Sequence, residues 1–310
     1  MAQIINGFDV SDLSHNFKLL NYPEQVPGRT VHIDADFLAY QVSFDEQKTL
    51  EKMQHGCDEI INRIVKLGGA EHYVLYLTPH KSDKGNRYNI ALLKEYQSTR
   101  KSKPKPKMLH VIRDWMHNER GAIMCLHAEA DDGMASAQYK TADKNLSIIA
   151  SKDKDLTIVP GLNLDWDTGE ISDTADDNFG WIELDCSGKQ KKIRGRGWKY
   201  FWAQMLTGDP ADTISGLPKI CDPELFPKPK LCGPVTAFDV LNPIQSNVDA
   251  FLRVRELYKQ YGDMFGFVNY RDESSITYKQ AFVSEAQLLW MRREPENDHD
   301  VLFWMKEHCL

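Results

Sequence analysis

Residues 31–37 read VHIDADF, a short β-branched run that is followed at once by Asp34 and Asp36. β-Branched residues favour strands, and a short apolar run that stops at carboxylates predicts a buried strand with a polar end. Three later stretches share this character: HYVLYLT at 72–78, AIMCLH at 122–127 and LSIIASKDKD at 146–155. We therefore expect four strands in the first half of the chain.

Helix-like stretches lie between the predicted strands, at about 46–67, 86–99, 107–119 and 131–143. Strands that alternate with helices indicate a three-layer α/β fold around a mainly parallel central sheet. A polar stretch with weak strands follows at 163–200, and the rest of the chain looks mainly helical. We expect an N-terminal α/β domain at 1–165 and a C-terminal, mostly helical region at 166–310.

The composition argues against several classes of protein. The 310 residues contain no run of about eighteen apolar residues, so we expect no contact with a membrane. The first residues lack the basic and apolar blocks of a secretory signal. The six cysteines are scattered without a CxxC pair, which favours free thiols in the cytoplasm over disulfides or a zinc site.

Positive charge is concentrated in two stretches, although the net charge of the chain is −7. RKSKPKPK at 100–107 and KQKKIRGRGWK at 189–199 contain no acidic residue. Two basic stretches in an acidic protein suit contact with a polyanion near an acidic centre, although each could also be a solvated loop.

Three of the four predicted strands run into carboxylates. The acidic residues after them are Asp34; then Glu129, Asp131 and Asp132; then Asp153 and Asp155. The carboxyl ends of parallel strands lie at one edge of a sheet, where ligands bind in such folds. A further pair, Asp209 and Asp212, lies in the turn-rich stretch LTGDPADTISGLP at 206–218.

So many carboxylates at one site repel each other unless cations bind between them. Oxygen ligands without a matching His or Cys set favour Mg²⁺, for which Mn²⁺ can substitute, over zinc. Two such ions about 3.5–4 Å apart serve phosphodiester hydrolysis, because they activate a water and stabilise charge on the attacking and leaving oxygens.

The order of these motifs resembles the 5′-nuclease superfamily of flap endonucleases and phage-type 5′→3′ exonucleases. The stretches that carry the resemblance are VHIDADFLAY (31–40), RYNIALLKEYQSTRKSKPKP (87–106), HAEADDGMASA (127–137), IIASKDKDLTIVPG (148–161) and LTGDPADTISGLP (206–218). The resemblance implies an enzyme of phage or bacterial DNA replication, repair or recombination, acting on DNA with 5′ ends or flaps. Whether RNA in a hybrid is also cut stays open, and a monomer is expected.

The resemblance implies two metal sites and a helical arch at about 80–108. The first metal would be held by Asp34, Glu129, Asp131 and Asp132, and the second by Asp153, Asp155, Asp209 and Asp212. Arg100 would contact phosphate near the scissile bond, and Tyr96 would stack on a terminal base. The family places a lysine where this chain has Gln97, so that Lys94, Lys84 or Arg87 would have to replace it.

The resemblance also implies a helix-hairpin-helix motif that binds duplex phosphate, often with K⁺. Gly216, Gly233 and Thr236 fit it if residues 219–231 are an insertion. Further DNA contacts are expected from Lys101 and Lys103, and from Lys191, Lys192, Arg194 and Arg196. The aromatic residues Trp198, Tyr200, Phe201 and Trp202 lie beside the second basic stretch, and both core packing and base stacking are open for them.

Two other functions compete with a nuclease. A haloacid-dehalogenase-type magnesium phosphatase would use Asp34 as nucleophile and Asp36 as acid/base. Phosphatases of that class have threonine or valine at the position of Leu38, and this function leaves the other acidic motifs unexplained. A non-catalytic DNA-binding protein would not keep so many carboxylates facing phosphate without metals.

Overall fold

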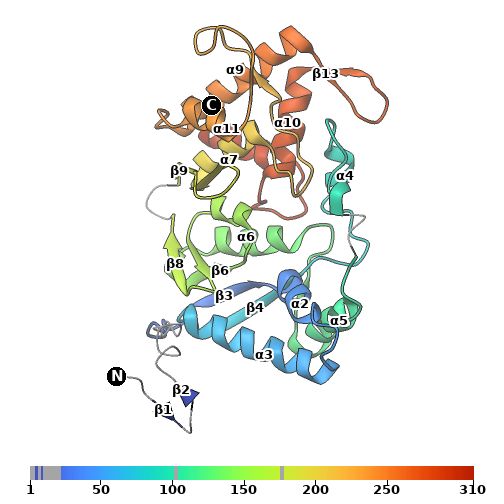
Figure 1. The fold of residues 1–310 in the computed structure, drawn as a ribbon, viewed down its shortest axis with the longest axis vertical. Helices are drawn as coiled ribbons and strands as arrows, with labels where there is room; N and C mark the ends of the chain where they lie inside the picture. Colours follow the sequence, from blue (N-terminus) through green and yellow to red (C-terminus); the bar gives the residue numbers. More distant parts are fainter. Residues whose placement is uncertain (1–3, 6–7, 10–21, 101–103, 175–177) are drawn as a thin grey trace.

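The computed structural model describes residues 4–5, 8–9, 22–100, 104–174 and 178–310, and Figure 1 shows their arrangement. A central sheet has its strands in the order β5-β4-β3-β6-β7-β8. The strands are β3 (Thr30–Asp34), β4 (His72–Leu77), β5 (Ile123–Met124), β6 (Ser147–Ala150), β7 (Leu162–Asp165) and β8 (Glu170–Asp173). All neighbours are parallel except β7 and β8, so the predicted mainly parallel sheet is confirmed.

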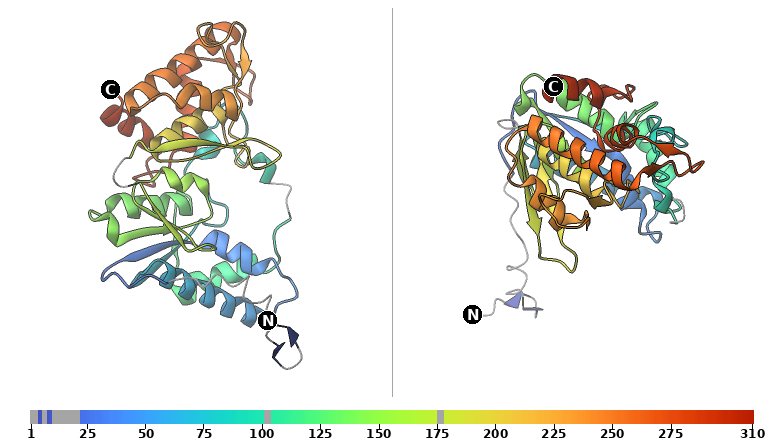
Figure 2. Two further views of the ribbon diagram at one scale, coloured as in Figure 1. Left: turned by 60° about the vertical axis from the view of Figure 1, so that its left-hand side comes forward. Right: turned by 90° about the horizontal axis from the view of Figure 1, so that it is seen from above.

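Helices cover both faces of this sheet, which confirms the three-layer arrangement. One face packs against α2 (Ala35–Ser43), α3 (Leu50–Leu67) and α5 (Leu109–Arg120), and the other against α6 (Ala130–Lys140) (Figures 1 and 2). In α3, Met53, Cys57, Ile61 and Ile64 recur at intervals of three or four residues, which places them on the buried stripe of the helix. The Thr49 side chain caps the helix start by accepting from Lys52 N, and Gly68 ends it.

Helix α2 was not predicted, and one expectation about the helices was wrong. The segment after β3 is helix α2, because Asp34 caps it and Leu38, Ala39 and Val42 form an apolar stripe. The long helix expected at 86–99 is instead the one-turn helix α4 (Arg87–Ile90), a loop and the 3-10 turn η1 (Ser98–Arg100). Distant partners take the backbone groups of this loop: Leu92 N donates to Ser284 Oγ and Gln97 N donates to Asp212 O. Tertiary hydrogen bonds therefore replace the helical ladder.

The rest of the chain is mainly helical, as expected. Its helices are α7 (Gly197–Thr207), α8 (Pro234–Leu241), α9 (Asn247–Phe265), α10 (Tyr278–Leu289) and α11 (Asp300–His308). Its hairpins pair β9 (Trp181–Asp185) with β10 (Lys192–Arg196), β11 (Lys219–Ile220) with β12 (Lys230–Leu231), and β13 (Phe267–Val268) with β14 (Ser275–Ile276). The boundary expected at 165/166 falls inside the β7–β8 hairpin, so the central sheet continues to Asp173.

Short elements complete the described chain: the two-residue strands β1 (Ile4–Ile5) and β2 (Phe8–Asp9), and the 3-10 turns η2 (Lys144–Leu146) and η3 (Lys154–Ile158). All six cysteines are free thiols. Among the described residues, no helix is both long and apolar enough to span a membrane.

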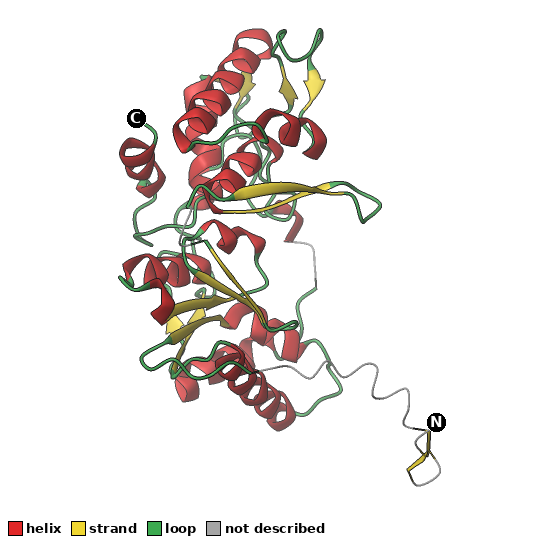
Figure 3. Ribbon diagram, turned by 90° about the vertical axis from the view of Figure 1, so that its left-hand side faces the viewer, coloured by secondary structure: helices red, strands yellow, loops and turns green. Residues whose placement is uncertain are grey.

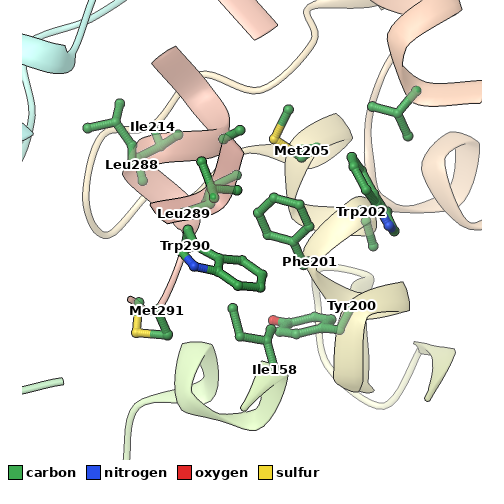
Figure 4. Close-up of a cluster of buried hydrophobic side chains, with 14 of the residues drawn as sticks. Ile158, Tyr200, Phe201, Trp202, Met205, Ile214, Leu288, Leu289, Trp290 and Met291 are labelled. Atoms are coloured by element: carbon green, nitrogen blue, oxygen red, sulfur yellow. The ribbon is translucent and has the colours of Figure 1, made fainter. Parts of the chain in front are cut away.

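One hydrophobic cluster joins the α6 face of the sheet to the C-terminal helices. Figure 4 shows Phe201 of α7 between Trp290 and Trp202, with Ile158 of η3 below them. Phe201, Trp202 and Trp304 are all at most 1% exposed. Most of the aromatic run at 198–202 is therefore core rather than a stacking surface, and this core ties the helical region to the sheet.

Candidate metal centre

The acidic residues gather around a cavity of about 480 Å³ at the carboxyl edge of the central sheet. Six of the eight predicted metal ligands line it: Asp34, Glu129, Asp131, Asp153, Asp209 and Asp212. The parallel register brings Asp34 opposite Tyr76 of β4, and β6 ends beside β3, so that two strand ends meet at this point. The cavity is thus a direct product of the parallel sheet.

Capping geometry fixes the carboxylates of the first group. Asp34 accepts hydrogen bonds from Phe37 N at 2.9 Å and from Ser151 Oγ at 3.0 Å. Glu129 caps helix α6 and contacts Lys84 Nζ at 3.0 Å and the Tyr96 hydroxyl at 2.9 Å. The two carboxylates are therefore held by a local cap and by donors from distant segments.

Asp132 lies outside the cavity, and its predicted role as a metal ligand is corrected. Its side chain is fully buried and receives two hydrogen bonds from Arg87, at 2.7 and 2.9 Å. It also accepts from Glu129 N at 3.1 Å and from Arg292 N at 3.2 Å. At the third position of α6 the carboxylate turns back toward the helix start, so Asp132 holds the Glu129 backbone and does not line the cavity.

The second group forms the tightest cluster. Asp155, Asp209 and Asp212 each offer an oxygen within 4.8 Å of the others, so these three could hold a metal ion. Asp155 lies behind the cavity wall, where Gln204 Nε2 donates to it at 2.5 Å. Asp153 caps η3 by accepting from Asp155 N at 2.8 Å. Gln204 was not predicted as a site residue, because it lies in an otherwise apolar helix.

The loop that carries Asp209 and Asp212 depends on two glycines with positive φ. Gly208 (φ +67°) and Gly216 (φ +62°) pack against each other, and a Cβ on Gly216 would lie 2.2 Å from Gly208 N. Asp209 and Ile214 exchange two backbone hydrogen bonds across the turn. Only glycine fits so close a backbone approach in the left-handed region, which explains the spacing of the GDxxD stretch.

Of the three predicted helix-hairpin-helix residues, Gly216 does not offer a free amide to phosphate. Gly216 N donates to the buried Glu285 carboxylate at 2.6 Å, so this amide already has an anionic partner. Thr236 is buried in α8, whereas Gly233 caps that helix. The expected insertion at 219–231 is the excursion that contains β11 and β12. An internal carboxylate therefore takes the amide that was expected to bind phosphate.

Burial and mutual repulsion raise the pKa values of several of the acidic side chains. Burial and the charge of Asp36 raise the pKa of Asp34 to about 6, and burial raises the pKa of Asp153 to about 6. Burial followed by the charge of Asp153 raises the pKa of Asp131 well above its usual range. The all-oxygen donor set and its unfavourable clustering fit a hard divalent cation.

Only some of the basic residues that were expected near phosphate line the cavity. Lys84 and Arg100 line the cavity, and Arg100 contacts Asp212 at 2.6 Å. Arg87 is fully buried on Asp132, whereas Lys94 is exposed and does not line the cavity. Lys84 is thus the candidate that replaces the lysine missing at Gln97, whose amide donates to Asp212 Oδ1 at 3.0 Å.

Tyr96 is 2% exposed, so its predicted role as a stacking surface is wrong. Its hydroxyl donates a hydrogen bond to Glu129 instead. Phe37 and Tyr40, on the outer turns of α2, are 38% and 40% exposed and line the cavity. Sequence analysis missed them because α2 itself was not predicted.

The expected DNA contacts of the second basic stretch lie on the β9–β10 hairpin, which projects from the body of the molecule (Figure 3). Lys191 and Lys192 are exposed, Arg194 contacts Asp185 at 2.6 Å, and Arg196 lies at the base of the hairpin. Lys101 and Lys103 lie outside the described residues.

Replacing Tyr96 by Phe distinguishes a role in base stacking from a role in positioning Glu129. A stacking residue tolerates this change, but loss of the hydroxyl bond to Glu129 should weaken Mn²⁺ binding by about 1 kcal/mol, or roughly fivefold. Isothermal titration calorimetry measures the change, with Tyr40→Phe as the matched control. Unchanged Mn²⁺ affinity in Tyr96→Phe would show that the hydroxyl does not position the carboxylate.

No family model matches the chain, and no curated protein matches it either. Among solved structures, it resembles the D15 protein of phage T5 co-crystallised with metal ions, with 13% identity, 85% of this chain and 87% of that chain covered, and a TM-score of 0.50. A T5 5′-exonuclease with divalent metal ions (zinc) bound is 15% identical, covers 85% and 87%, and has a TM-score of 0.49. A D15 flap endonuclease complex with DNA and metal ions is 12% identical, covers 84% and 99%, and has a TM-score of 0.45. At this level of identity the likeness concerns the fold: the chain has the α/β fold of the phage T5 D15 protein.

Proposed function

We propose that the protein is a metal-dependent nuclease that hydrolyses DNA phosphodiester bonds at or near 5′ ends, as a 5′→3′ exonuclease or flap endonuclease. The observation that carries the proposal is the cavity at the edge of a parallel sheet that is lined by six of the predicted metal ligands. The shared fold supports it, because the T5 D15 protein is described as co-crystallised with metal ions.

Two Mg²⁺ ions, or Mn²⁺ in their place, would be held by Asp34, Glu129 and Asp131 on one side and by Asp153, Asp155, Asp209 and Asp212 on the other. When bound, such ions supply an activated water and stabilise charge on the phosphate oxygens. The side chains of Lys84 and Arg100 flank the same cavity, where they would bind the phosphate of the reacting strand.

The other parts of the site would position the DNA. Phe37 and Tyr40 offer exposed aromatic faces at the cavity, on which a base of the reacting strand can stack. The β9–β10 hairpin would contact the backbone of the duplex through Lys191 and Lys192. A K⁺ site near α8, RNA in hybrids as a substrate, a monomeric state and a place in the cytoplasm of a phage-infected host remain predictions.

The phosphatase alternative conflicts with the contacts of Asp36. Its carboxylate is held by Arg113 at 2.9 Å and accepts from Thr78 N at 3.0 Å, so it is not free to act as an acid/base beside Asp34. A phosphatase would also have no use for the cluster of Asp155, Asp209 and Asp212.

The nuclease assay uses 5′-labelled DNA, both blunt and with a 5′ flap, with Mg²⁺ or with EDTA. Asp131→Asn and Asp155→Asn should each slow cleavage by about 100-fold or more, because each change removes metal-binding charge. Asp263→Asn, an exposed change on α9, is the matched control. Full cleavage in EDTA, or by both site variants, rules out the proposed mechanism.

Arg100→Ala distinguishes phosphate chemistry from duplex binding. We expect single-turnover cleavage to fall at least about tenfold while Kd for the duplex changes less than about twofold, because Arg100 contacts the cavity and not the duplex surface. Lys191→Ala on the hairpin should show the reverse pattern. A parallel loss of binding and rate in Arg100→Ala would contradict its assignment.

Metal affinity should depend on pH in a defined direction. The raised pKa values mean that Asp34 and Asp153 are mostly protonated below pH 6, and metal binding must displace these protons. Affinity for Mn²⁺ should therefore fall by at least about tenfold between pH 7.5 and pH 5.0. Calorimetry in buffers of different ionisation enthalpy measures both affinity and proton release, and constant affinity over this range would exclude these two ligands.

A further inference from the structure

Lys154 lies in the middle of the tightest carboxylate cluster. Its ammonium is 2.8 Å from Asp155 Oδ1 and 2.7 Å from Asp209 Oδ2. The two carboxylate side chains are only 7% and 4% exposed, whereas the lysine side chain is 52% exposed. The cation thus reaches from solvent into a buried pair of acids.

These two carboxylates belong to the set of three that could hold a metal ion, with Asp212 as the third. Some of their oxygens already accept hydrogen bonds from other groups. Asp155 Oδ1 already accepts from Gln204, and the other oxygen of Asp209 accepts from Ala211 N at 2.8 Å. A divalent ion bound among these carboxylates lies close to the ammonium, and two cations so close together repel each other. Metal and ammonium therefore compete for the cluster.

A displaced Lys154 side chain has a defined place to go. The residue lines the acidic cavity, an adjoining cavity of about 260 Å³ and a groove of about 650 Å³ along the β9–β10 hairpin. Glu170 lines both the adjoining cavity and the groove, so its carboxylate offers the displaced ammonium a partner of opposite charge. A flexible lysine stem can swing into this space without any change in the backbone.

We propose that Lys154 is a built-in competitor of the second divalent ion. It neutralises Asp155 and Asp209 in the metal-free protein, and metal binding displaces it toward Glu170, where it adds positive charge to the groove. The inference rests on the proposed metal-dependent function. By linkage, a polyanion in the groove then strengthens metal binding, because it favours the displaced position of the lysine.

The test is Mn²⁺ binding to the full chain, measured by calorimetry and by electron paramagnetic resonance of free Mn²⁺ at pH 7.5. Lys154→Met should bind the second ion at least about tenfold more tightly than the unchanged protein, since the competing charge is gone. Lys154→Arg keeps the charge and should not show this gain.

Lys152→Met is the matched control. Lys152 also lines the acidic cavity, but it contacts Asp165 and Asp167 at 2.7 Å, outside the cluster of three. An equal gain in Lys152→Met, or no gain in Lys154→Met, overturns the inference and leaves the nuclease proposal intact. Absence of Mn²⁺ binding in every form, with unchanged thermal unfolding, overturns both.

Discussion

Repulsion among buried carboxylates is the constraint around which this protein is organised. Seven of them line one cavity, and several segments bring cations to this cluster: Lys84 to Glu129, Arg100 to Asp212, and Lys154 to Asp155 and Asp209. Unpaired, these charges would cost several kcal/mol each in so dry a place. The same arrangement makes the site receptive to divalent metal ions, since these neutralise more charge in less space than side chains do.

Hydrogen bonds and ion pairs to these carboxylates connect the α/β sheet region to the C-terminal helices. Arg87 binds Asp132 and also donates to Trp290 O, while Arg292 N donates to Asp132. Glu285 of α10 holds the glycine loop that carries two of the acids. The C-terminal helices are therefore part of the metal centre's support as well as a candidate DNA surface, and the hydrophobic core that continues from α6 to α11 keeps this support rigid.

The residues that sequence reasoning misassigned share a physical cause. Asp132, Arg87, Tyr96 and Gly216 were expected to face a metal, a phosphate or a base, yet each is used internally. Buried polar groups need partners, and a motif residue that finds one inside the protein cannot serve a ligand at the same time. The motif spacing does not distinguish the two uses, because both require the same side chain at the same position.

The order of residues alone was enough to predict the parallel sheet, its acidic edge and six of the carboxylates that line the cavity. Those features follow from local patterns: β-branched runs that end in acid, and helices between them. It could not predict the broken segment at 86–100 or which basic side chain faces the cavity. These depend on hydrogen bonds between residues far apart in the chain, such as Gln97 to Asp212 and Leu92 to Ser284, which form only once the sheet and the C-terminal helices have packed together.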